Sequence, residues 1–145
     1  MKSSTLLKLD LMAAAEEARL LEELGRQNQA LRTYEEQTEV LETYKARLAS
    51  GWQNGKIVQA AQARRAEQFS QQARDASQSL AQSIEAAHAK RSALTQALTS
   101  LRLRRDKLQA RLKTAHQTEA TTAQNRAERN RPALPAQPDA YTVLS

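Results

Sequence analysis

The chain has 145 residues, a net charge of +6 and no cysteine, and only 3% of its residues are aromatic. Aromatic side chains supply much of the buried area in compact cores. A chain this poor in them, with only three glycines and three prolines, is typical of long helices or coiled coils and not of a globular domain. The lack of cysteine excludes disulfides and thiolate metal sites.

Neither a membrane helix nor a leader is predicted. No apolar run approaches the roughly 20 residues that a transmembrane helix needs. Lys8 and Asp10 interrupt the apolar residues near the N-terminus, which a signal peptide would need in one continuous run. We therefore expect a cytoplasmic protein.

Positive charge increases along the chain. Residues 1–49 hold seven basic and nine acidic side chains, a balance of −2. Residues 50–101 hold six and three, which gives +3, and residues 102–145 hold nine and four, which gives +5. The C-terminal third is therefore the part of the chain best suited to an acidic partner.

Apolar residues in the first third recur at alternating steps of four and three, the spacing of the a and d positions of a coiled coil. Three of the nine positions are polar, so the seam is imperfect. The positions are Leu20, Leu24, Gln27, Leu31, Tyr34, Thr38, Leu41, Lys45 and Leu48. The rhythm extends back through Ala13 to Leu6, although Asp10 and Glu17 weaken it there.

Helix-breaking residues before Pro132 form one cluster. Proline costs a helix roughly 3 kcal/mol and an interior glycine roughly 1 kcal/mol. No proline precedes Pro132, and apart from Gly25 the glycines are Gly51 and Gly55. The sequence therefore predicts a helix over residues 4–49, a turn over 50–55 and a second helix over 56–130.

The second predicted helix repeats the spacing with one interruption. Its seam begins with Phe69, Ala73, Ala76 and Leu80. After an extra step of four it continues through Ile84, Ala87, Arg91, Leu94, Leu98, Leu101, Arg105, Leu108, Leu112 and Ala115. We interpret the extra step as a stutter, which locally unwinds a supercoil.

Two such helices joined by a short turn predict an all-α fold. It is a long antiparallel two-helix coiled-coil hairpin over residues 1–131, in which each helix covers the apolar stripe of the other. Trp52 would lie in the turn, either packed on Ile57 or Val58 or free to anchor a partner. Residues 132–145, with three prolines, predict a disordered tail.

Nothing in the sequence predicts catalysis. His88 and His116 lack an acidic residue at ligand spacing. The paired glutamates, such as Glu16 and Glu17, point about 100° apart on a helix and form no carboxylate dyad. No glycine-rich phosphate loop or nucleophile motif is present. We expect no enzyme, no cofactor and no bound metal.

A basic cluster follows the second half of the seam, at Arg102, Arg104, Arg105, Lys107, Arg111 and Lys113. Such clusters bind phosphates, but this one has no interleaved aromatics for base stacking and no zipper-type basic region. We therefore expect no nucleic-acid partner. The residues either flank the seam, as charged residues flank most coiled coils, or bind an acidic protein surface.

Two sets of four residues near the predicted turn share the same spacing. They are Gln37, Leu41, Tyr44 and Leu48 on the first helix, and Phe69, Ala73, Ala76 and Leu80 on the second. They resemble two surface stripes, Gln-Leu-Tyr-Tyr and Phe-Leu-Ala-His, of the central-stalk proteins of type III protein export, the FliJ/YscO family. Five of the eight positions match; Leu48, Ala73 and Leu80 replace a Tyr, a Leu and a His.

The resemblance, which covers residues 37–80, implies a specific function. Members resemble the γ stalk of rotary ATPases: their paired termini enter the pore of a hexameric export ATPase, and their tip reaches the export gate of the inner membrane. The resemblance implies that residues 102–131, with the six basic side chains, contact the ATPase. It also implies that the eight stripe residues contact the gate and that export chaperones are further partners. The protein would be peripheral to the membrane complex.

Two questions remain open at this level. The Trp-containing run that many flagellar members carry before the Phe is absent here, which favours an injectisome over a flagellar system. The same heptads also fit a generic coiled-coil scaffold or chaperone without an ATPase partner.

Overall fold

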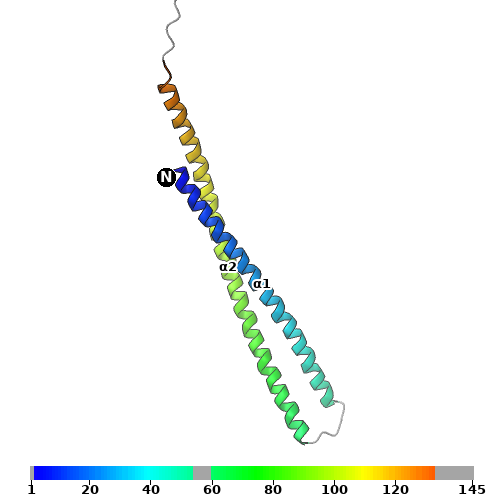
Figure 1. The fold of residues 1–145 in the computed structure, drawn as a ribbon. Coiled ribbons are helices and arrows are strands. Elements are labelled where there is room, and N and C mark those ends of the chain that lie inside the picture. Colours follow the sequence, from blue (N-terminus) through cyan, green and yellow to red (C-terminus); the bar gives the residue numbers. More distant parts are fainter. Residues whose placement is uncertain (1, 54–59, 133–145) are drawn as a thin grey trace, which may run out of the picture. The chain divides into compact units, whose positions relative to one another are not determined.

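The computed structural model describes residues 2–53 and 60–132, with two helices in the order α1 and α2 (Figure 1). Helix α1 spans Ser3–Gln53 and helix α2 spans Ala60–Arg129. The first helix therefore continues four residues past its predicted end, because Gly51 alone does not stop it. The remainder of the predicted turn, the side chain of Trp52 and the predicted tail beyond Pro132 lie outside the described residues.

The chain divides into two compact units, which we describe separately. The central unit comprises residues 12–105, and the terminal unit comprises residues 1–11 together with 106–145. Both units contain part of α1 and part of α2. The predicted all-α fold of two long antiparallel helices is confirmed within each of them.

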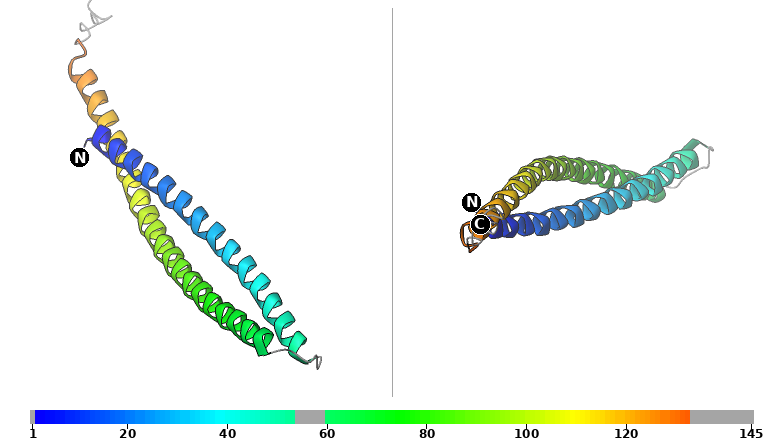
Figure 2. Two further views of the ribbon diagram at one scale, coloured as in Figure 1. Left: turned by 60° about the horizontal axis from the view of Figure 1, so that its bottom comes forward. Right: turned by 90° about the horizontal axis from the view of Figure 1, so that it is seen from above.

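Within the central unit the two helices run in opposite directions, as both views in Figure 2 show. Glu17 meets Arg102 and Arg105, Leu31 lines a groove with His88, and Leu48 lines another with Ser70. Residue numbers thus rise on α1 as they fall on α2. This steady register is that of an antiparallel coiled coil.

The seam of α1 is confirmed. All nine predicted positions from Leu20 to Leu48 are buried or half-buried, and so are Leu6, Asp10, Ala13 and Glu17 before them. The polar members have local partners. Gln27 donates to Glu23 at 3.2 Å, and the Thr38 hydroxyl donates to the Tyr34 carbonyl at 2.8 Å.

The predicted seam of α2 is wrong at Phe69, Ala76 and Arg91, which are exposed, and right at Ala73 and Leu80. Phe69 is 48% exposed and Ala76 is exposed, while Ser70 and Ser77 are half-buried beside Ala73 and Leu80. The observed positions Ser70, Ala73, Ser77, Leu80, Ile84 and Ala87 keep steps of three and four without a stutter. The leucine-rich part of α2 sets the register. Towards the start of α2 the same register passes through the small residues Ser70 and Ser77, which still let the backbone approach α1.

The fully buried residues are small or aliphatic. In the terminal unit this is Leu6; in the central unit they are Ala13, Leu20, Leu31, Ala73, Ala87, Leu98 and Leu101. None of the described polar or charged residues is fully buried. Neither α1 nor α2, over its described residues, is long and apolar enough to cross a membrane.

Candidate partner-binding surfaces

The eight stripe residues divide into two equal groups. Leu41, Leu48, Ala73 and Leu80 lie on the seam and are buried or half-buried. Gln37, Tyr44, Phe69 and Ala76 are exposed, and each comes one residue before a seam position. In an antiparallel pair, the positions that precede the seam in this way fall on the same side of both helices. The stripes therefore belong to one side of the central unit.

A groove between α1 and α2 brings five of these eight residues together. Gln37, Leu41 and Tyr44 line it from α1, and Ala76 and Leu80 line it from α2. Its other lining residues are Thr33, Glu36 and Val40. We call the exposed residues of this side, namely Gln37, Val40, Tyr44, Phe69 and Ala76, the Tyr44 face.

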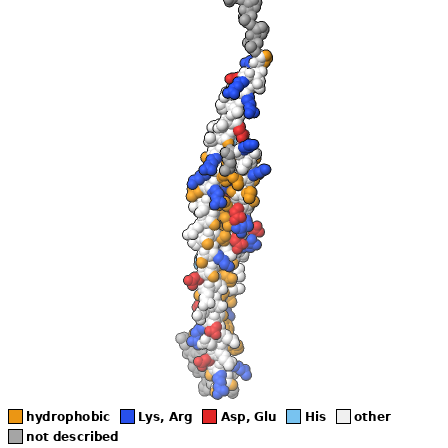
Figure 3. Space-filling model, turned by 90° about the vertical axis from the view of Figure 1, so that its left-hand side faces the viewer, with side chains coloured by type: hydrophobic (Ala, Val, Ile, Leu, Met, Phe, Trp, Pro, Cys, Tyr) orange, Lys and Arg blue, Asp and Glu red, His pale blue; other side chains and the backbone are white. Residues whose placement is uncertain are grey.

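The Tyr44 face exposes large apolar side chains to solvent. Val40 is 70% exposed and Tyr44 is 41% exposed, and Phe69 lies one heptad from Ala76 on the same side of α2. Figure 3 shows hydrophobic side chains lying open between charged ones on the side that it draws. Aromatic residues in such positions are the usual anchors of protein interfaces.

Three stripe residues do not line this groove. Phe69 lies beyond its end, and Ala73 is buried between the helices. Leu48 lines a different groove with Lys45, Ala49, Ser70 and Arg74. The predicted stripes thus combine exposed residues on one side of the two helices with seam residues that lie beneath them.

The Tyr44 face is bordered by negative charge. Between Thr33 and Tyr44, helix α1 carries four glutamates and no basic residue. Glu42 pairs with Lys45 at 3.3 Å, whereas Glu35, Glu36 and Glu39 form no ion pair within the described part of the chain. A partner with basic residues beside its apolar ones would therefore fit here.

The six predicted basic residues do not all have the same environment. Arg102 Nε lies 3.0 Å from Glu17 Oε1, and Arg105 Nη1 lies 2.5 Å from Glu17 Oε2. The hydrogen bonds from Arg102 and then from Arg105 hold the pKa of the Glu17 carboxyl below its usual value. These two arginines thus tie α2 to α1, and Glu17 is half-buried at its seam position because they neutralise it.

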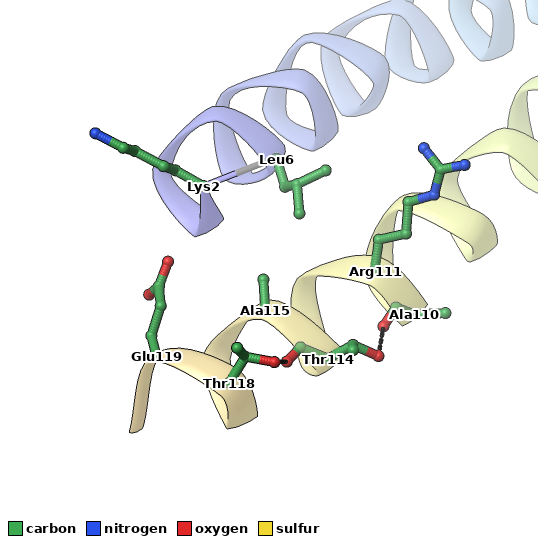
Figure 4. Close-up of a pocket in the computed structure, with 8 residues that line it drawn as sticks. All are labelled: Lys2, Leu6, Ala110, Arg111, Thr114, Ala115, Thr118 and Glu119. Carbon is green, nitrogen blue, oxygen red and sulfur yellow. Dashed lines mark hydrogen bonds between the residues drawn. The ribbon is translucent and has the colours of Figure 1, made fainter. Parts of the chain in front are cut away.

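The other four basic residues, Arg104, Lys107, Arg111 and Lys113, are exposed. Arg104 belongs to the central unit and the remaining three belong to the terminal unit. Arg111 lines a groove of the terminal unit together with Lys2, Leu6 and Ala115 (Figure 4). In that view the Leu6 and Ala115 side chains point towards one another across the groove.

At this groove the first residue of α1, Ser3, is hydrogen-bonded to Glu119 of α2. The Ser3 backbone N–H donates to Glu119 Oε1 at 3.0 Å, and the Ser3 hydroxyl donates to Glu119 Oε2 at 2.6 Å. The hydroxyl bond and then the backbone bond lower the pKa of the Glu119 carboxyl. The carboxylate satisfies a donor that the first turn of a helix otherwise leaves free.

Sequence reasoning missed several surface residues. Val40, Leu7, Leu9 and Leu11 are exposed and lie outside the single stripe of seam positions that the heptad spacing predicts. These residues could have been predicted as a second surface, because α1 has more apolar residues than its seam positions account for. Glu17 interrupts the apolar spacing of the seam, but in the structure it accepts hydrogen bonds from Arg102 and Arg105.

The described residues hold no group of three or more His, Cys, Asp or Glu side chains placed to bind a metal ion. His88 lines a shallow groove with Glu35 and Arg91, and His116 is exposed on α2.

Comparison with known proteins gives no relative: no family model, no curated protein and no solved structure matches this chain.

Proposed function

We propose that this chain is a central-stalk component of a type III protein export apparatus. In this role it binds the pore of the hexameric export ATPase, promotes the activity of the ATPase and links it to the export gate. It acts by binding alone and works in the cytoplasm at the inner-membrane export apparatus. Export chaperones are further candidate partners.

One observation carries the proposal. Five of the eight residues that resemble the family's gate-facing stripes line a single groove, and the exposed members of both stripes lie on one side of the helix pair. A seam explains Leu41 and Leu80, but it does not explain why Tyr44 and Phe69 stay exposed. Two exposed aromatics beside an apolar groove are the expected form of a docking surface.

The basic residues supply the other contact. Because Arg102 and Arg105 hold Glu17, the proposed ATPase contact depends mainly on Arg104, Lys107, Arg111 and Lys113. Exposed basic side chains of this kind speed association with an acidic surface and give it a strong salt dependence.

The gate contact can be tested by calorimetry with the cytoplasmic domain of the export gate. Tyr44→Ala combined with Phe69→Ala should weaken binding at least tenfold, because truncating an interface anchor typically costs about 2 kcal/mol. The matched control combines Leu21→Ala with Leu103→Ala, which removes two equally exposed apolar side chains elsewhere in the central unit. If both double variants bound the gate domain with equal affinity, the proposed contact between the Tyr44 face and the export gate would be contradicted.

A generic coiled-coil scaffold is the competing function. It predicts that the chain binds neither the ATPase nor the gate, so binding of the unaltered chain to both partners excludes it.

A further inference from the structure

The start of α1 carries more leucine than α2 covers. Leu6 is 2% exposed and packs in the terminal unit, but Leu7, Leu9 and Leu11 are 46%, 38% and 60% exposed. Three exposed leucines within five residues are a large apolar surface for a helix that already has a partner. Something beyond α2 must cover them if they are to be removed from water.

The three leucines point in opposite directions. Successive residues of an α-helix are about 100° apart, so Leu7 and Leu11 lie about 40° apart, whereas Leu9 lies about 160° from either of them. A helix that rests on a flat surface gathers its apolar residues on one face. Here both flanks of α1 are apolar, so the partner surface has to reach around the helix from two sides.

The surroundings of these leucines are basic. The described residues of the terminal unit, 2–11 and 106–132, hold eight Lys or Arg and four Asp or Glu, a balance of +4. Lys2 just before α1, Lys8 on α1, and Lys107 and Lys113 on α2 are all exposed. In Figure 4 the Lys2 side chain extends away from the groove, where it is free to meet a partner. Charge complementarity therefore calls for an acidic surface around the apolar one.

We infer that Leu7, Leu9 and Leu11 are the apolar anchor that fixes the terminal unit in a protein socket, which has apolar walls on two sides of α1 and an acidic rim. This rests on the proposed function, in which the socket belongs to the pore of the export ATPase ring. It adds that affinity comes from the leucines on both flanks of α1, while the basic side chains steer the approach and meet the rim.

The test measures binding of full-length variants to the assembled ATPase hexamer. Leu7→Ser combined with Leu11→Ser removes one flank, and Leu9→Ser alone removes the other. The matched control is Leu21→Ser combined with Leu103→Ser, which are 45% and 58% exposed, close to the values for Leu7 and Leu11. Circular dichroism checks that every variant keeps the helix content of the unaltered chain.

The socket predicts at least tenfold weaker binding for both flank variants and less than a twofold change for the control. Binding of either flank variant that equals the control would overturn the two-sided socket while leaving the proposed function intact. A failure of the unaltered chain to bind the hexamer would overturn the proposed function and the socket together.

A membrane surface is the remaining alternative, and a second measurement distinguishes it. The unaltered chain is sedimented with vesicles of phosphatidylglycerol and phosphatidylcholine. The socket predicts no difference in sedimentation between the unaltered chain and the Leu7→Ser, Leu11→Ser variant. Vesicle binding that this variant loses while it still binds the hexamer normally would contradict the socket and assign the leucines to lipid.

Discussion

Glu17 illustrates how single residues decide the behaviour of this fold. Its position on the seam is unfavourable for a carboxylate, yet two arginines from α2 donate hydrogen bonds to it there. The sequence could not predict this, because Arg102 and Arg105 lie more than eighty residues away and their partner depends on the register of the two helices. From charge alone, Arg102 and Arg105 cannot be distinguished from the other four residues of the basic cluster.

The Glu17 ion pair predicts a defined pH dependence. The pKa of Glu17 in the folded chain is below its usual value of 4.5. Its contribution to stability is therefore fully present above pH 4.5 and is lost as the pH falls through the lowered pKa. Glu17→Gln should lower the free energy of unfolding at neutral pH, and its difference from the unaltered chain should shrink in acid.

Urea unfolding at a series of pH values measures this difference. Glu22→Gln is the control, because Glu22 is exposed and forms no ion pair among the described residues. A difference for Glu17→Gln that stays constant from neutral to acid pH would show that the charge of Glu17 does not stabilise the fold.

Ser77 predicts an increase in stability. Its hydroxyl is the one buried side-chain oxygen in the described residues that has no hydrogen-bond partner. Burying such a group costs about 1 kcal/mol or more, and alanine is a better helix former by about 0.5 kcal/mol. Ser77→Ala should therefore raise the free energy of unfolding by about 1.5 kcal/mol in urea titrations.

Ser79 provides the control for that measurement. It is exposed on the same helix, two residues away. Ser79→Ala should gain only the helix-propensity part, about 0.5 kcal/mol. If the two alanine variants were equally stable, the buried hydroxyl would carry no cost.

At the scale of the elements, the long helices and their antiparallel pairing follow from the sequence. The regular spacing of leucines in α1, and of leucines from Leu94 to Leu112 in α2, is strong enough to identify the seam. Between Phe69 and Leu80 the sequence offers two neighbouring registers, one through Phe69 and Ala76 and one through Ser70 and Ser77. The more apolar choice, Phe69 and Ala76, was wrong, because the register is set by the rest of α2 and not by local hydrophobicity.

The second half of α2 is not packed evenly along its length. The seam leucines between residues 94 and 112 are buried or half-buried, whereas every residue from His116 to Arg129 is exposed. In and just before that segment, four threonine hydroxyls donate to carbonyls four residues earlier, those of Thr114, Thr118, Thr121 and Thr122. Such bonds satisfy the hydroxyls but add no packing.

The seam position of Leu98 predicts a large loss on truncation. Leu98 is buried in the central unit, whereas Leu103 is exposed on the same helix. Leu98→Ala should lower the free energy of unfolding by about 2 to 3 kcal/mol, because it removes buried methyl groups and leaves a cavity. Leu103→Ala should change it by less than about 0.5 kcal/mol. Similar losses for both variants in urea unfolding would contradict the observed seam.

For the whole molecule, two surfaces with different chemistry stand out. The Tyr44 face, in the central unit, has exposed aromatics, and the glutamates that border it are mostly without an ion pair among the described residues. The terminal unit combines exposed leucines with a net positive charge. The charge gradient and the stripe spacing were evident in the sequence. The leucine anchor was not, because only the structure shows which leucines the seam leaves uncovered.

Two surfaces of opposite charge would allow one chain to bind two different partners. The most direct test of the proposed function is whether the chain links the export ATPase to the export gate. The export ATPase hexamer is immobilised, and the cytoplasmic domain of the export gate is passed over it with and without the chain. The gate domain should be retained only when the chain is present. With Tyr44→Ala and Phe69→Ala the chain should stay on the ATPase while the gate domain is lost. Retention of the gate domain that does not depend on the chain, or no retention with it, would contradict the role of a stalk.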